Sequence, residues 1–453
     1  MIEQKMLIGG QECAASNGAV FERKNPLDGS VATRAPAATT EDAIRACEAA
    51  AAAFPAWSQL GPNARRAMLM KASQALEAKG EAIAAAMAAE TGASGIWAGF
   101  NVHLAASMLL EAASLTTQIN GEIIPSDVPG SVAMAVRQPA GVVLGIAPWN
   151  APVILAVRSI STALACGNTV ILKGSELCPA THGLIIEALQ DAGLPAGVVN
   201  FVTNAPEDAG TVVEAMVAHP AVRRVNFTGS TRVGRIIGQT CAKHLKPVIL
   251  ELGGKAPFLV LDDADVDAAV AGCTFGAFAN SGQICMSTER FVVDNKVADE
   301  FIAKFAAKAQ SLPLGDPRKG PVVLGSVVDL ATVERCNAMI DDALAKGAKL
   351  VCGGKAENTL MPATLIDGVT PIEDVLRTLA LDALPHDAQY DTLAGFLMVM
   401  LRRVPRRTDS VVWGGYKFEV LDVDSYRIDQ VMVSRTTPSA GSAPPTAAGN
   451  STA

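Results

Sequence analysis

Short apolar runs alternate with longer segments of helical periodicity between Val142 and Leu252. The apolar runs are β-rich and uninterrupted, which is typical of parallel strands buried on both faces. They are Val142–Ile146, Thr169–Lys173, Val198–Val202, Val222–Phe227 and Val248–Leu252. The helical stretches between them are Pro152–Cys166, Thr181–Ala192, Glu207–Ala218 and Thr231–His244. This alternation predicts an α/β fold with a doubly wound parallel sheet.

The segments on either side of this region have other patterns. An Ala-rich region over residues 40–115 has helical periodicity and predicts several packed helices. A second α/β stretch runs from Leu252 to about Ile366, with helices expected at Val266–Phe278, Val297–Gln310 and Val333–Lys346. After Pro371 the pattern predicts a small α+β domain, a helix followed by a β-meander. Its elements are Asp391–Arg402, Val411–Trp413, Tyr416–Val423 and Tyr426–Val433.

Composition and charge narrow the class of protein. The chain has 453 residues, half of them hydrophobic, with 37 Lys and Arg against 45 Asp and Glu. The net charge of −8 disfavours a nucleic-acid partner. No apolar run reaches the length of about 20 residues that a membrane span needs, and the N-terminus lacks the pattern of a signal peptide.

Cysteine and histidine usage limits the chemistry further. Nine cysteines, an odd number without a Cys-x-x-Cys pair, fit a reducing compartment, and we expect a cytoplasmic protein. None of the five histidines has metal-ligand spacing, so no metal site is expected. The histidines give no support for a Ser-His-Asp triad either, so we expect a catalytic base to be a carboxylate.

Polar residues follow the carboxyl ends of two predicted strands, where α/β sheets build their sites. Asn150 follows the first strand and could donate to an oxyanion, although a turn residue before Pro152 would have the same sequence. Lys173 and Glu176 follow the second strand and suit a ribose diol. The carboxylate would repel a 2′-phosphate, which favours NAD over NADP. Isolated residues of this kind would more often be solvated loop charges.

Three further positions need context to be interpreted. Gly229 and Ser230 precede a predicted helix, whose free N–H groups would suit a pyrophosphate. The Gly-x-Gly-x-x-Gly fingerprint is missing, so an ordinary helix cap is also consistent. Cys285 lies in an apolar neighbourhood, where a cysteine is usually a small buried hydrophobe.

Taken together and in order, these segments resemble motifs of the aldehyde dehydrogenase superfamily over residues 1 to about 370. The segments are Ile146–Pro152, Lys173–Glu176, Phe227–Thr231, Glu251–Lys255 and Gly282–Ser287. Two more segments, Trp97–Ser107 and Glu176–His182, are most similar to the branch of salicylaldehyde, benzaldehyde and vanillin dehydrogenases.

The resemblance implies a role for each motif residue. Cys285 would be the nucleophile and Glu251 the base that activates the deacylating water, while Asn150 and the Cys285 backbone N–H would form the oxyanion hole. The cofactor, NAD, would be held by Lys173, Glu176, Gly229, Ser230 and Trp149. The implied reaction is the oxidation of an aldehyde, expected to be aromatic, to a carboxylic acid through a thiohemiacetal and a thioester. A homo-oligomer of the family type would also follow, although the family's C-terminal oligomerisation strand is missing from this chain.

The resemblance ends near Asp367, before the Glu-x-Phe-Gly-Pro segment with which the family holds the nicotinamide ribose. The following residues instead resemble the transporter-associated domain of the CorC/HlyC type, in Ile372–Val375, Tyr390–Phe396, Arg403–Pro405, Tyr416–Asp424 and Arg427–Val431. The chain therefore reads as a fusion. Two alternatives stay open: a catalytically impaired fusion that binds nucleotide or regulates through its C-terminal domain, and a cofactor-independent cysteine esterase.

The expected division of the chain follows from these resemblances. Residues 1–252 would form the N-terminal helical region and the NAD-binding domain, with 118–138 an oligomerisation hairpin. Residues 253–370 would form an incomplete catalytic domain and 371–435 the transporter-associated-like domain. Residues 436–453, rich in Ser, Thr, Pro and Ala, would be a disordered tail.

Overall fold

The computed structural model describes residues 1–345, 347–367, 384–385, 393–403, 405–424 and 427–436. The chain divides into two compact units, Met1–Ile366 and Asp367–Ala453.

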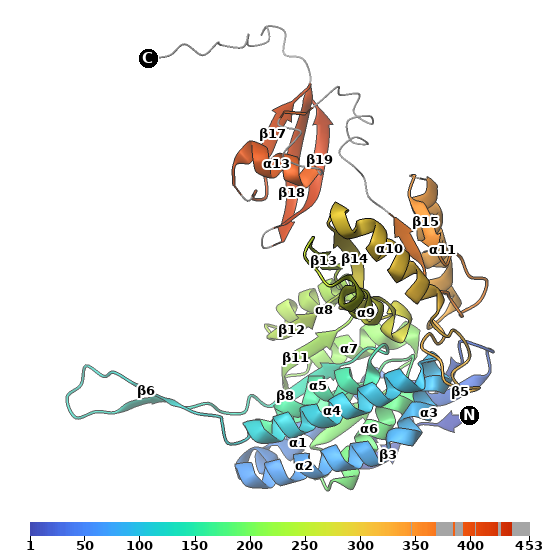
Figure 1. The fold of residues 1–453 in the computed structure, drawn as a ribbon. Coiled ribbons are helices and arrows are strands. Elements are labelled where there is room, and N and C mark those ends of the chain that lie inside the picture. The colour runs from blue at the N-terminus through green and yellow to red at the C-terminus, as the bar shows by residue number, and fades with distance from the viewer. Residues whose placement is uncertain (346, 368–383, 386–392, 404, 425–426, 437–453) are drawn as a thin grey trace. The chain divides into compact units, whose positions relative to one another are not determined.

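The largest sheet of the described residues has seven strands in the order β12-β11-β8-β9-β10-β2-β3. Figure 1 labels β12, β11, β8 and β3 among them. Five of the seven strands run parallel: β8 (Val142–Ile146), β9 (Thr169–Lys173), β10 (Val199–Val202), β11 (Val222–Thr228) and β12 (Val248–Glu251). The chain moves outward from β8 through β9 to β10, and then returns to the other side of β8 as β11. The loops after β8 and β11 therefore flank a topological switch point, where open α/β sheets bind their ligands.

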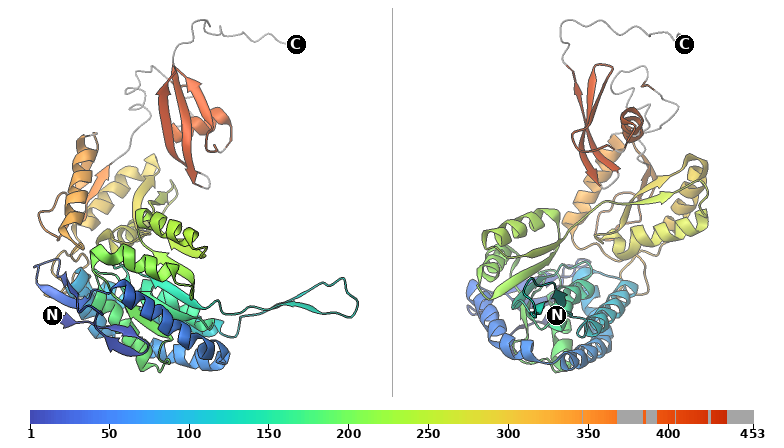
Figure 2. Two further views of the ribbon diagram at one scale, coloured as in Figure 1. Left: turned by 180° about the vertical axis from the view of Figure 1, so that it is seen from behind. Right: turned by 90° about the vertical axis from the view of Figure 1, so that its left-hand side faces the viewer.

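Helices cover both faces of this sheet, as the alternation of runs predicts (Figure 2). On one face α5 (Pro152–Ala165) and α6 (Pro179–Asp191) share a core with α2 (Pro62–Ala78), α3 (Gly80–Thr91) and α4 (Gly95–Leu115). On the other face lie α1 (Thr40–Gln59), α7 (Ala209–Ala218) and α8 (Thr231–Lys243). Successive residues of one strand enter different cores: Val143 belongs to the first and Leu144 to the second. The doubly wound α/β fold is confirmed.

The expectation that all five strands are buried on both faces is wrong for two of them. Strands β8, β9 and β10 are buried at every position. In contrast, Arg223 and Arg224 of β11 are exposed, and Ile249 of β12 is 66% exposed. The reason is position, because β12 is the terminal strand of the sheet and β11 is its neighbour.

At the opposite edge of the sheet, the sequence indicates a β-like segment at Leu7-Ile8 but does not predict its pairing. There, β2 (Met6–Ile8) pairs antiparallel with β10, and β3 (Gln11–Cys13) pairs with β2. A separate sheet is formed by β1 (Ile2–Glu3), β5 (Val31–Pro36) and β4 (Val20–Lys24). The strands β1, β2 and β3 have only two or three residues, which is too short to show an alternating pattern in the sequence.

The rest of the first unit forms a smaller α/β layer. Parallel strands β13 (Ala256–Val260) and β14 (Thr288–Val293) are joined through α9 (Val266–Phe278) and the short helix η2 (Ala279–Gly282). Helix α10 (Asn295–Gln310) packs on them with three aromatic rings, Phe291, Phe301 and Phe305, whose centroids lie 4.9 to 6.3 Å apart. Then follow α11 (Leu330–Ala345), β15 (Lys349–Cys352) and β16 (Leu365–Asp367).

A β-hairpin projects from the first unit (Figures 1 and 2). Its strands are β6 (Glu122–Ile124) and β7 (Ala133–Ala135), and Ile123 lies opposite Met134. These two side chains are 80% and 66% exposed. The hairpin therefore presents apolar side chains to solvent, which is unusual for a peripheral segment.

The described part of the second unit is a helix and an antiparallel meander, as the sequence predicts. It consists of α13 (Leu393–Leu401), β17 (Ser410–Trp413), β18 (Tyr416–Asp424) and β19 (Arg427–Arg435). The rings of Phe396 and Phe418 meet edge to face at 5.2 Å and join the helix to the sheet. The predicted helix start at Asp391, the predicted strand start at Tyr426 and the tail from residue 437 lie outside the described residues. No helix in the described ranges is both long and apolar enough to cross a bilayer.

Candidate active site

The loop after β8 is bound to the loop that leads to Cys285. The carbonyl oxygen of Asn150 accepts hydrogen bonds from Trp97 Nε1 and from Asn280 Nδ2, both at 2.9 Å. In return, Asn150 Nδ2 donates to the carbonyl oxygen of Gln283 at 2.9 Å. Two segments that are 130 residues apart in the sequence are thus held at one place. Trp149, which the sequence assigned to cofactor binding, lies in the same loop and is half-buried.

The loop before Cys285 has an unusual backbone. Asn280, Ser281 and Gly282 have φ values of 49°, 55° and 76°, so three consecutive residues are left-handed. This conformation costs about 1–2 kcal/mol for an L-residue other than glycine. The loop is held by side chains, since Ser281 Oγ donates to the Gly325 carbonyl at 3.3 Å and Gln283 Oε1 accepts from Val328 N at 2.9 Å. Strained backbone of this kind clusters at functional sites.

The Cys285 thiol lies beside the Glu251 carboxylate, at the carboxyl end of β12. Burial of the half-buried thiol is the main cause that raises its pKa, and the charge and hydrogen bond of Glu251 raise it further. Arg158 of α5 acts in the opposite direction through its positive charge, and its guanidinium also donates to Thr228 Oγ1 at 3.2 Å. At rest, Cys285 is therefore a thiol with a carboxylate in reach of its proton. The structure brings Cys285, Glu251 and Asn150 into one site, as expected.

Lys173 and Glu176 are not solvated loop charges. They form an ion pair in which the Lys173 side chain is 6% exposed and that of Glu176 is 20% exposed. Burial by itself would raise the pKa of Glu176, but the Lys173 charge and several hydrogen bonds lower it below its usual value. Asn204 Nδ2 donates to Glu176 Oε1 at 2.9 Å, and Asn204 Oδ1 is buried without a partner among the described residues. An ionised carboxylate beside an unpaired acceptor suits the hydroxyl groups of a ribose.

Gly229 and Ser230 form the start of α8 next to the switch point. Ser230 caps the helix, since its Oγ accepts from Val233 N at 3.3 Å, and the expected cap is present. A Cβ at Gly229 would lie 2.5 Å from the Phe227 ring, so only glycine allows the chain to pass this closely. The exposed first turn of α8 offers N–H groups and the positive end of the helix dipole. The loops after β9 and β11 thus fit the two ends of an adenosine diphosphate.

Comparison with known protein families gives two matches in the chain. Residues 13–378 match the aldehyde dehydrogenase family. The chain belongs to the aldehyde dehydrogenase family. Residues 363–437 match the family described as transporter associated domain, so both parts of the predicted fusion are confirmed.

Individual relatives of the aldehyde dehydrogenase part are similar over most of their length. The chain is 62% identical to a vanillin dehydrogenase of Pseudomonas fluorescens over 370 residues, which cover 82% of this chain and 76% of the relative. It is 49% identical, with a TM-score of 0.79, to the structure of a salicylaldehyde dehydrogenase from Pseudomonas putida G7 complexed with salicylaldehyde. That match covers 81% of this chain and 76% of the other.

A third relative bears on the cofactor. The structure of an NAD-dependent benzaldehyde dehydrogenase from Corynebacterium glutamicum is 36% identical, with a TM-score of 0.76, over 80% of this chain and 79% of the other. The chain is thus an aldehyde dehydrogenase by family and by its relatives, and a nicotinamide cofactor is supported.

Sequence reasoning missed three residues of this aldehyde dehydrogenase site. Arg158 is the only charged residue of α5, and an isolated charge in an apolar helix could have indicated a role. Asn280 and Gln283 hold the loop between Asn150 and Cys285. Gln283 was part of a quoted motif, but its contacts come from segments too distant in sequence to be anticipated.

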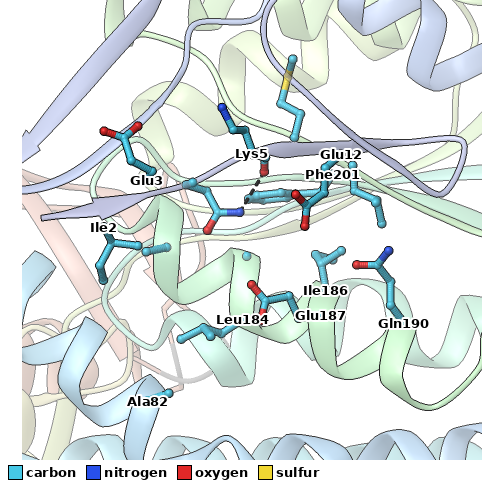
Figure 3. Close-up of a pocket in the computed structure, with 15 residues that line it drawn as sticks. Ile2, Glu3, Lys5, Glu12, Ala82, Leu184, Ile186, Glu187, Gln190 and Phe201 are labelled. Atoms are coloured by element: carbon cyan, nitrogen blue, oxygen red, sulfur yellow. Dashed lines mark hydrogen bonds between the residues drawn. The ribbon is translucent and has the colours of Figure 1, made fainter.

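Other parts of the first unit do not contribute to this site. A cavity of about 220 Å³ lies between the N-terminal strands and α6 (Figure 3). It is lined by residues such as Glu3, Lys5, Glu187 and Phe201, and by none of the predicted site residues. Among the residues that the structure describes, no group of three or more metal-ligating side chains occurs.

Proposed function

We propose that this chain oxidises an aromatic aldehyde to the carboxylic acid with NAD as the hydride acceptor. The observation that carries the proposal is the approach of the Cys285 thiol to the Glu251 carboxylate beside Asn150, at the edge of the switch point. The aromatic substrate is supported by the relatives, whose names state that they act on vanillin, salicylaldehyde and benzaldehyde.

Cys285 carries the first step. Its thiolate adds to the aldehyde carbon, and Glu251 is placed to take the thiol proton. The oxyanion that forms needs donors. Asn150 uses one N–H of its amide for the Gln283 carbonyl, and an amide nitrogen has a second N–H to offer. The Cys285 backbone N–H would be the other donor. When bound, the nicotinamide supplies the hydride acceptor that turns the hemithioacetal into a thioester.

Glu251 carries the second step. Water must add to the thioester carbon, and a carboxylate close to Cys285 can take a proton from that water. The carbon–sulfur bond then breaks, and the acid leaves as the sulfur regains a proton. Each turnover consumes one aldehyde, one NAD⁺ and one water, and gives one carboxylic acid, one NADH and one proton.

Glu176 supports NAD rather than NADP as the cofactor. Its low pKa keeps the carboxylate ionised, and a 2′-phosphate at the same ribose would meet this charge in a partly buried place. Discrimination of this kind needs a charge that cannot move away. The ion pair with Lys173 and the hydrogen bond from Asn204 hold Glu176 in position.

Steady-state formation of NADH tests the proposal with vanillin and salicylaldehyde as substrates. We expect turnover with NAD, at least tenfold less efficient use of NADP, and complete loss of activity in Cys285→Ala. The matched control is Cys336→Ala, which removes a half-exposed thiol from α11 and should behave as the parent. Rapid-quench analysis of Glu251→Gln should show an accumulated acyl-enzyme. Activity in Cys285→Ala, or equal efficiency with NADP, would contradict the assignment.

The junction leads to a further expectation about rate. The Glu-x-Phe-Gly-Pro segment of the family is missing after Asp367, so the nicotinamide ribose lacks one anchor, and turnover should be slower than in the relatives. NAD binding without turnover would favour the impaired, nucleotide-binding alternative. Hydrolysis of an activated ester without NAD would favour the esterase.

We also propose that residues 118–138 mediate association between copies of the chain. The hairpin exposes apolar side chains on both of its strands and projects from its unit, so the same surface is available on a second copy (Figure 1). Pairing of such surfaces would remove them from water.

A further inference from the structure

His182 lies in α6 and contacts both the turn after β9 and the end of the loop after β8. It is fully buried, and its Nδ1 accepts a hydrogen bond from the backbone N–H of Ser175 at 3.1 Å. The ring also makes a hydrogen bond to the backbone of Pro152, the first residue of α5. Burial is the main cause that lowers its pKa to about 4, so the ring is neutral.

The two hydrogen bonds determine the tautomer. Because Nδ1 accepts from Ser175, the proton of the neutral ring is on Nε2. Pro152 has no N–H, so its carbonyl is the acceptor for that proton. Each ring nitrogen thus has one backbone partner, one in the turn after β9 and one at the start of α5. Cys178 Sγ, 3.7 Å from Nε2, packs against the same edge.

Helix α6 does not depend on His182 for its start. The buried carboxylate of Glu90 accepts hydrogen bonds from Ala180 N at 2.8 Å and from Thr181 N at 2.9 Å. The first turn is therefore fixed by another residue, from α3. The start of α6 therefore does not need the hydrogen bond between Ser175 N and His182 Nδ1. That hydrogen bond instead holds Ser175, the residue directly before Glu176.

We infer that His182 is a positioning residue for the nucleotide, which holds the turn between Lys173 and Glu176 in the conformation that receives the adenosine ribose. The inference rests on the proposed function, since it assumes that this turn binds NAD. The turn has little freedom to compensate. Gly174 N already donates to the Val202 carbonyl at 3.0 Å, and a Cβ at Gly174 would meet the Phe201 ring at 2.8 Å. Without an acceptor at Nδ1, the buried Ser175 N–H could be paired only if the turn moved, and Glu176 would move with it.

Two substitutions in the full chain separate this role from simple packing. His182→Leu keeps an apolar side chain of similar size without an acceptor. His182→Asn places its Oδ1 close to the position of Nδ1 and restores the acceptor. Titration with NAD and with ADP-ribose should show binding weakened by about tenfold in His182→Leu and by no more than about twofold in His182→Asn. In His182→Leu the KM for NAD should rise in parallel, while kcat at saturating NAD and the KM for vanillin stay unchanged.

Hydrogen exchange supplies a readout that does not need a ligand. The peptide that contains Ser175 should exchange faster in His182→Leu than in the parent or in His182→Asn. If His182→Leu does not fold, His182→Gln, whose longer side chain displaces the acceptor, takes its place with the same expectations.

The outcomes distinguish the inference from the proposed function. Parental binding of ADP-ribose by His182→Leu, with weaker binding in Glu176→Gln, would overturn the inference alone. A fall in kcat together with a fall in thermal stability, with the KM for NAD unchanged, would show that His182 has only a packing role. That result would also overturn the inference. If neither the parent nor any variant bound NAD, the nucleotide role of this turn and the inference would fall together.

Discussion

Replacement of Gly229 by alanine tests most directly the loop that we propose to bind the NAD pyrophosphate. The added Cβ would lie 2.5 Å from Cζ of Phe227 and 3.1 and 3.2 Å from its Cε atoms, whereas ordinary contacts begin at 3.4 Å. The ring is 4% exposed and packed in the core of the sheet, so it cannot swing away. The loop must therefore move by about 1 Å, which carries the α8 N-terminus with it. Overpacking of this kind costs about 1–3 kcal/mol of stability.

The displaced loop should also bind NAD less well. A misplacement of about 1 Å can cost roughly a hundredfold in rate, so we expect kcat/KM for NAD to fall by about 10- to 100-fold. Urea unfolding and NAD titration on one preparation measure both effects. Gly210→Ala in α7 is the matched control, because its Cβ would meet no described atom within 4 Å. It should stabilise the protein by about 0.4–1 kcal/mol through the unfolded state and leave NAD binding unchanged. Parental stability and NAD affinity in Gly229→Ala would refute the steric argument.

Three further predictions concern other parts of the chain. Alkylation of Cys285 by iodoacetamide should accelerate as the pH rises to and beyond 9, because only the thiolate reacts and burial and Glu251 raise its pKa. In Glu251→Gln the acceleration should begin at lower pH. An unchanged pH profile would show that Glu251 does not influence the Cys285 thiol. Glu90→Ala should destabilise the first unit by about 3–5 kcal/mol in urea unfolding, since it leaves the buried donors of Thr33, Ala180 and Thr181 unpaired. Parental stability would show that water or another group satisfies them. The double variant Ile123→Asp/Met134→Asp should shift light scattering to a smaller species without changing thermal stability. An unchanged mass would show that the hairpin does not mediate association.

Much of the parallel sheet could be predicted from the sequence because its strands differ clearly from the helices between them. Strands β8 and β9 begin and end at the predicted residues, and helix α9 does so as well. The exposure of β12 could not be predicted, since its apolar run is the same whether the strand is central or terminal. Position in a sheet depends on pairing between distant segments, which a local pattern does not contain.

In the candidate site, too, the contacts between distant segments could not be predicted from a local pattern. Cys285 and Glu251 could be named from their motifs, but their proximity depends on how β12 and the loop after α9 come together. The left-handed backbone of Ser281 could not be anticipated, because serine has no preference for that region. His182 would have been classed with ordinary core residues, since a buried histidine at helical spacing gives no other signal in the sequence.

The left-handed run before Cys285 has a consequence for the order of folding. Asn280 and Ser281 lose energy when they adopt this backbone, and their side chains are held there by hydrogen bonds to partners 130 and 44 residues away in the chain. These hydrogen bonds can form only after the elements on both sides have acquired their own structure, because each joins two loops that those elements position. During refolding, the secondary structure, followed by far-ultraviolet circular dichroism, should therefore recover first, while the loop before Cys285 has not yet reached its native conformation. Enzymatic activity would then be the last native property to return.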